Sequence, residues 1–100
     1  LQKVKRRLVQ MLLEKVKKSL RISHDHLDDE IQDTINACKL DMSISGIIAI
    51  NEEDPLIIRA IILYCKSHLG LMNPDSIKYD QSYNALKIHL ALCGDYNDVQ

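Results

Sequence analysis

A nearly continuous apolar run over residues 54–70 constrains this chain more than any other feature. Asp54 and Pro55 are typical of a helix start, because the carboxylate can accept a hydrogen bond from a first-turn backbone N–H and proline needs no such bond. Gly70 follows the last apolar residue and is typical of a helix end. Between these ends Arg59 is the only charge before Lys66, so the helix must be covered on several sides. The predicted core residues are Leu56, Ile57, Ala60, Ile61, Tyr64 and Cys65.

The spacing of apolar residues predicts helices on both sides of this run. Residues 3–20 carry an apolar stripe at intervals of three and four, and residues from about 25 to 43 carry another, with Gly46 as its stop. Residues 47–50 read as an extended connector. A last helix is expected from residue 74 or 75 to about 93. The first stripe consists of Val4, Leu8, Met11, Leu12, Val16 and Leu20, and the last of Tyr79, Tyr83, Leu86, Leu90 and Cys93, widened by Ile88 and Leu92.

We therefore expect an all-α fold, a small bundle of about four helices around the central apolar helix 54–70. Residues 1–100 make a single helical domain, with residues 1–10 as a possible N-terminal extension and residues 95–100 as a flexible tail.

The composition supports a globular domain. Hydrophobic residues make up 46% of the chain, with only 3 Gly and 2 Pro. The 3 cysteines include no C-x-x-C pair, which favours a reducing compartment over a disulfide framework. The central run is shorter than the roughly 20 apolar residues of a membrane span, and no apolar segment of a signal peptide follows the basic residues 1–21. We expect no contact with a membrane.

Charge is distributed unevenly along the chain. Residues 1–21 hold eight basic residues against Glu14 alone, whereas residues 22–100 hold five basic and thirteen acidic residues. Either the basic residues form a solvated helix face, or they contact nucleic acid or an acidic partner. The candidate contact residues are Lys3, Lys5, Arg6, Arg7, Lys15, Lys17, Lys18 and Arg21. The candidate complementary acidic patch is Asp25, Asp28, Asp29, Glu30 and Asp33.

The few residues with metal-binding or catalytic chemistry are better explained structurally. His24 and His26 lie among acids, but no further ligand has recognisable spacing, so a polar helix start is the better interpretation. Cys65 and His68 lie one helical turn apart, a spacing that recurs by chance. We predict no catalytic, metal or cofactor residues, no cofactor, and no enzyme.

A helix-turn-helix DNA reader is also disfavoured. Such a motif needs a polar, basic recognition helix after a short turn. The second predicted helix instead begins with acids, which phosphates repel, and no helix precedes the first to act as its partner.

From about Met11 to Asn97 the chain resembles the gp6-like head–tail connector family of tailed phages, small helical proteins of DNA packaging and head completion. The matching stretches are EKVKKSLRI (14–22), LDDEI (27–31), DPLI (54–57), YCK (64–66) and YNALKIHLAL (83–92). The last is similar to the branch found in phages and prophages of Gram-positive bacteria.

This resemblance implies a structural virion protein. Such a protein would form a homo-oligomeric ring of about a dozen subunits beneath the portal protein. It would lie in the virion neck, after assembly in the host cytoplasm, and bridge the portal to stopper or tail proteins. Phage DNA would pass through its channel without sequence specificity.

Segregated charge suggests how such a ring is held together. In a head-to-tail ring the basic first segment of one subunit can meet the acidic patch of the next, or it can face the portal or DNA. The alternative function is a small helical nucleic-acid-binding regulator of phage or bacterial origin. A third is a small enzyme or metal protein built on His24 and His26.

Overall fold

The computed structural model describes residues 2–69 and 74–97, and every regular element in these ranges is helical. The elements are α1 (Gln2–Leu20), α2 (Asp28–Ile44), α3 (Pro55–Leu69), α4 (Ser76–Ala91) and the single turn α5 (Gly94–Asn97). The prediction of a small all-helical bundle is confirmed. Among the described residues, no helix combines the length and the apolarity needed to cross a membrane. The predicted stop at Gly70 lies outside the described residues.

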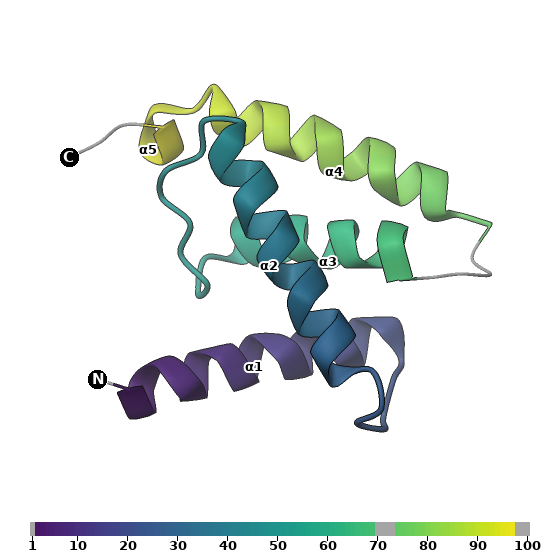
Figure 1. Cartoon of the computed structure of the whole chain (residues 1–100). Coiled ribbons are helices and arrows are strands. Elements are labelled where there is room, and N and C mark those ends of the chain that lie inside the picture. The colour runs from purple at the N-terminus through teal and green to yellow at the C-terminus, as the bar shows by residue number, and fades with distance from the viewer. Residues whose placement is uncertain (1, 70–73, 98–100) are drawn as a thin grey trace.

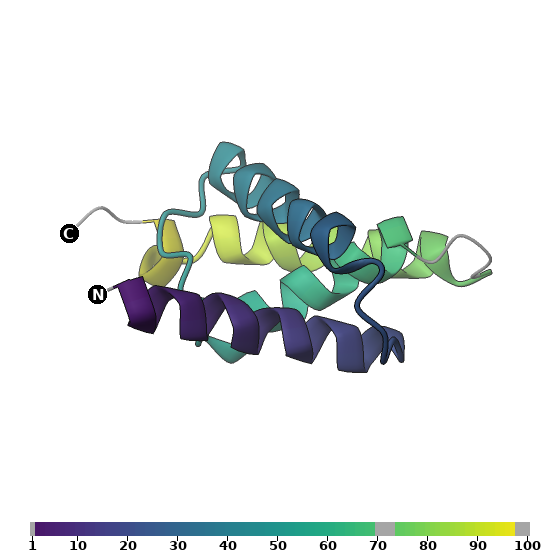
Figure 2. The same ribbon diagram turned by 60° about the horizontal axis from the view of Figure 1, so that its bottom comes forward.

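Helix α3 is the centre of the bundle. It packs against α1, α2 and α4, and Figure 1 shows α4 and α1 on opposite sides of it, with α2 crossing in front. The view in Figure 2 shows that α2 lies over one side of this arrangement. The chain measures 40 × 38 × 19 Å, so the molecule is about two helices thick.

The core is mostly aliphatic and draws on all four long helices. Its fully buried large side chains come from α1 (Val16), α2 (Ile31, Ile35, Met42), α3 (Ile57, Ile61) and α4 (Tyr83, Leu90), together with Ile47 of the connector. Ala60, Cys38 and Cys65 are also fully buried, and Tyr64 packs at the edge of the cluster.

The prediction that Leu56 belongs to the core is wrong. Its side chain is 44% exposed, because Leu56 lies in the first turn of α3 on the side away from Ile57 and Ile61. The predicted start of α3 is present: the Leu56 backbone N–H donates to Asp54 Oδ1 over 2.8 Å. This is the bond of an N-capping carboxylate.

The apolar stripes of α1 and α4 also differ from the prediction. In α1 the buried apolar residues are Leu12, Leu13 and Val16, whereas Met11 is 50% exposed. Leu13 projects toward the core because it lies nearer to Val16 around the helix than Met11 does. In α4, Tyr83 and Leu90 are buried, but the two residues expected to widen the stripe are exposed, Ile88 by 58% and Leu92 by 79%.

The C-terminal segment is folded onto the body of the protein. The carbonyl oxygen of Tyr96 accepts hydrogen bonds from the backbone N–H groups of Ile48 (2.7 Å) and Ala49 (3.1 Å). The Tyr96 hydroxyl donates to Asp54 Oδ2 over 2.8 Å. Within the predicted tail 95–100, residues 95–97 therefore belong to a helical turn that is bonded to the body of the protein, and residues 98–100 lie outside the described residues.

Candidate functional site

The basic residues of α1 form an exposed face. Exposed side chains are those of Lys3, Arg6, Arg7, Lys15 and Lys18, and Arg21 is exposed just after the helix. The side chain of Lys5 lies outside the described part of the chain. No acidic residue occurs before Glu14 in α1, and Glu14 accepts a hydrogen bond from Gln10 Nε2 over 2.8 Å. We call Lys3, Arg6, Arg7, Lys15, Lys18 and Arg21 the basic face.

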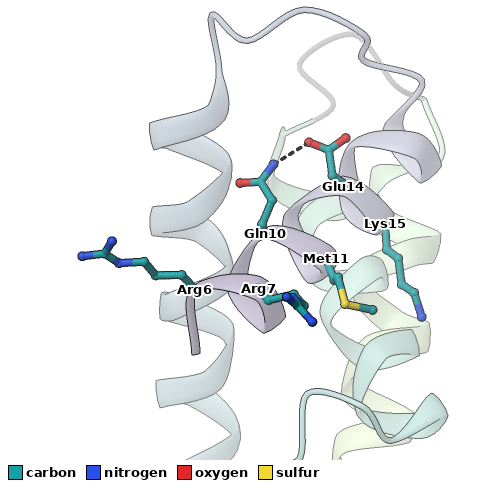
Figure 3. Close-up of a pocket in the computed structure, with 6 residues that line it drawn as sticks. All are labelled: Arg6, Arg7, Gln10, Met11, Glu14 and Lys15. Carbon is teal, nitrogen blue, oxygen red and sulfur yellow. Dashed lines mark hydrogen bonds between the residues drawn. The ribbon is translucent and has the colours of Figure 1, made fainter. Parts of the chain in front are cut away.

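An apolar residue lies inside the basic face. Arg7, Met11 and Lys15 follow one another at intervals of four residues and share one side of α1, as Figure 3 shows. Met11 helps to line two shallow hollows. One lies along α1 beside Arg6, Arg7 and Gln10, and the other lies between α1 and the turn that carries Glu52 and Glu53. This surface therefore combines exposed positive charge with an exposed apolar side chain.

Lys17 does not belong to the basic face. It is only 3% exposed, and its Nζ atom lies 2.8 Å from Asp28 Oδ1 and 2.9 Å from Asp25 Oδ1. Its hydrogen bonds with Asp28 and Asp25 raise the pKa of Lys17 above its ordinary value, so the ammonium stays charged. Lys17 therefore ties α1 to the start of α2 and is not offered to a partner.

The predicted acidic patch is divided by this pairing. Asp25 and Asp28 are engaged by Lys17, and the hydrogen bond from Lys17 lowers the pKa of Asp25. Asp29, Glu30 and Asp33 remain exposed on α2. Three of the five predicted acidic residues are thus available to a second molecule.

The turn after α1 sets the position of Arg21. The Ile22 N–H donates to Lys17 O (2.9 Å) and the Arg21 N–H donates to Lys18 O (3.2 Å), which is the hydrogen-bond pattern of a Schellman motif. Arg21 has a φ of +60°, in the left-handed region that favours glycine. Gly46 has the equivalent place after α2, with a φ of +102°.

Sequence reasoning missed a polar cluster between α2 and α4. Tyr83 Oη donates to Asp41 Oδ2 over 2.6 Å, and Lys87 Nζ donates to the same oxygen over 2.9 Å. Burial raises the pKa of Tyr83 far above its ordinary value, and its bond to Asp41 adds to this effect. Asp41 lies more than forty residues from both Tyr83 and Lys87 in the sequence, so no local pattern reveals the cluster.

Cys38, Cys65 and His68 lie where their side chains pack against other parts of the protein. Burial raises the pKa of both Cys38 and Cys65 to about 12, so these thiols stay protonated at neutral pH. His68 stacks on Tyr64, with ring centroids 4.1 Å apart. Within the described ranges, no group of three or more His, Cys, Asp or Glu side chains is placed to hold a metal ion.

Comparison with known proteins identifies the family. No curated protein and no solved structure matches the chain. A family profile described as phage connector protein matches residues 12–97, which include the C-terminal half of α1 and all of α2 to α5. This match covers most of the sequence, and it agrees with the all-helical bundle and with the resemblance seen in the sequence. The chain therefore belongs to the phage connector protein family.

Proposed function

We propose that this protein is the head–tail connector in the neck of a tailed phage or prophage. In this role it forms a ring of about a dozen copies beneath the portal protein and completes the head after DNA packaging. The ring joins the portal to stopper or tail proteins and leaves a channel for the genome. Assembly takes place in the host cytoplasm, before the ring becomes part of the virion. Membership of a structural phage family is the observation that carries this proposal.

The exposed charges of the chain support an assembly role. The basic face of α1 has almost no acidic residue of its own to neutralise it, and the acids Asp29, Glu30 and Asp33 lie exposed on α2. Opposite charges on different surfaces of one chain favour head-to-tail contacts, in which each copy uses both surfaces. A channel or portal location of the basic face is the competing arrangement, because DNA phosphates also attract cations.

The mass of the protein in solution tests the proposal most directly. We expect light scattering on a sizing column to show a ring-sized species, either for the protein alone or after addition of the portal protein. Higher salt should reduce its amount, because exposed charge pairs are screened. A chain that stays monomeric with and without portal would contradict the proposal. A stable dimer that retards DNA would favour the nucleic-acid-binding regulator instead.

Charge reversal separates the two locations of the basic face. The variant Lys15→Glu/Lys18→Glu leaves Lys17 and its structural ion pairs in place. If the basic face meets a neighbouring copy, this variant should lose the ring. If the face meets DNA, rings should form and genome retention should fail. Lys78→Glu, at an exposed position on α4, is the matched control and should change neither readout.

A further inference from the structure

The outer face of α1 changes character along the helix. Val4 is 58% exposed and Met11 is 50% exposed, and the exposed lysines Lys15 and Lys18 follow them. Intervals of seven, four and three residues place these four side chains on one side of α1, away from the buried Val16. This face is therefore apolar in its N-terminal half and basic in its C-terminal half.

The outer face of α2 changes in the opposite order. The exposed acids Glu30 and Asp33 come first, and they are followed by Leu40, which is 62% exposed, and Ile44, which is 77% exposed. These residues lie opposite the buried stripe of α2 that packs on the core. Figures 1 and 2 show no other helix of the chain over this side of α2.

The two faces match in length as well as in chemistry. Val4 and Lys18 are separated by the same number of residues as Glu30 and Ile44, a helical distance of about 21 Å. An antiparallel pairing of the faces joins apolar side chains to apolar ones and lysines to acids. A parallel pairing would set Lys18 against Ile44 and Val4 against Glu30, which leaves the charges unpaired.

Within one chain these faces do not meet. The internal contact between α1 and α2 uses their inner sides, where Lys17 binds Asp25 and Asp28 and where Val16 and Ile31 are fully buried. The outer faces are thus left for another molecule, and a second copy of this chain supplies the complement of each.

We propose that α1 of one copy packs antiparallel on α2 of the next copy in the ring. In the register given by the two faces, Lys15 lies opposite Asp33 and Lys18 opposite Glu30. The apolar contacts are Val4 with Ile44, Leu8 with Leu40 and Met11 with Ala37. This inference rests on the proposed ring and assigns the two surfaces that hold it together.

Charge exchange between copies tests the pairing. One variant carries Lys15→Glu/Lys18→Glu and the other carries Glu30→Lys/Asp33→Lys. Each alone should weaken assembly by at least roughly tenfold, because like charges then face each other across every contact. An equimolar mixture should restore the ring, since each variant then meets opposite charge on its neighbour. Circular dichroism checks that both variants fold, and Lys78→Glu is again the control.

Disulfide trapping tests the register without relying on ring stability. The variant Met11→Cys/Ala37→Cys should form reducible dimers and longer ladders at high protein concentration under mild oxidation. The matched control Met11→Cys/Asp29→Cys, which places the second thiol near the other end of α2, should form far fewer. Both pairs use exposed positions.

The outcomes distinguish this inference from the proposed function. Rings that survive both charge-reversal variants, or that are not restored in their mixture, overturn the α1–α2 pairing while the connector role stands. Equal trapping in the two cysteine variants overturns the register. A wild-type chain that stays monomeric even with portal overturns the proposed function itself.

Discussion

At the scale of single residues, two turns with the same hydrogen-bond pattern contain different amino acids. Arg21 and Gly46 both have positive φ at the end of a helix, but only glycine adopts this conformation without steric cost. Arg21 therefore stores strain at the end of α1, where a glycine would relieve it.

Exchanging residue types at these turns should change stability in opposite directions. We expect Arg21→Gly to raise the free energy of unfolding by roughly 0.5–1 kcal/mol and Gly46→Ala to lower it by about 1 kcal/mol. A Cβ atom at position 46 meets no other atom within 4 Å, so the loss would come from backbone strain alone. Urea unfolding measures both values. Equal effects of the same sign would contradict the argument.

The ionisable groups predict how stability depends on pH. Hydrogen bonding to Lys17 lowers the pKa of Asp25. Burial alone would raise the pKa of Asp41, but hydrogen bonds from Tyr83 and Lys87 outweigh the effect of burial, so the pKa of Asp41 is also lowered. A carboxyl group whose pKa is lower in the folded protein stabilises above its unfolded pKa of about 4, and this contribution is lost as pH falls. The free energy of unfolding should therefore decrease below about pH 4.

The buried thiols determine how the free energy of unfolding changes at alkaline pH. Cys38 and Cys65 have a pKa of about 12 in the folded protein, whereas unfolded thiols ionise near about 8.5. A raised pKa gives stability that is complete below the unfolded value and is lost as pH rises. Urea unfolding under reducing conditions should show a plateau near neutral pH and a decrease above about pH 9. A curve that stays flat to pH 10 would contradict the burial of these groups.

At the scale of the element, α3 has one face in the core and another on the surface. Ile61→Ala should lower the free energy of unfolding by about 2–5 kcal/mol, because it leaves a cavity among buried side chains. Leu56→Ala, five residues earlier and 44% exposed, should lower the free energy of unfolding by less than about 1 kcal/mol. Urea unfolding measures both changes in the free energy of unfolding. Similar decreases in the two variants would show that Leu56 belongs to the core.

Local sequence patterns predicted the elements better than their faces. The capping residue Asp54 and the spacing of apolar residues indicate where helices begin and which type of fold they form. They do not reveal which neighbouring helix covers each side, so they place Met11, Ile88 and Leu92 in apolar stripes although the fold leaves these side chains exposed.

The candidate site, too, is predictable from the sequence only in part. The exposed cations of α1 follow from its sequence, but Lys17 is distinguished from Lys18 only by a turn that brings Asp25 and Asp28 back to it. The bonds that fix residues 94–97 likewise depend on Asp54 and Ile48, which are distant in the sequence.

At the scale of the whole molecule, one continuous core joins all four long helices. Because no helix has a core of its own, the chain should unfold in a single cooperative transition. Circular dichroism of the helices and fluorescence of the tyrosines should report the same urea midpoint. Separate midpoints for the two signals would show that a helix, such as α1, unfolds independently.

The bonds around Tyr96 also have a mechanical consequence. Asp54 accepts hydrogen bonds from the Leu56 N–H at the start of α3 and from the Tyr96 hydroxyl in α5. A pulling force on the C-terminal segment therefore reaches the beginning of the central helix through the Tyr96–Asp54 bond and the connector through the bonds of Ile48 and Ala49 to the Tyr96 carbonyl, in addition to passing along α4. In this way tension applied at the end of the chain reaches the middle of the bundle directly.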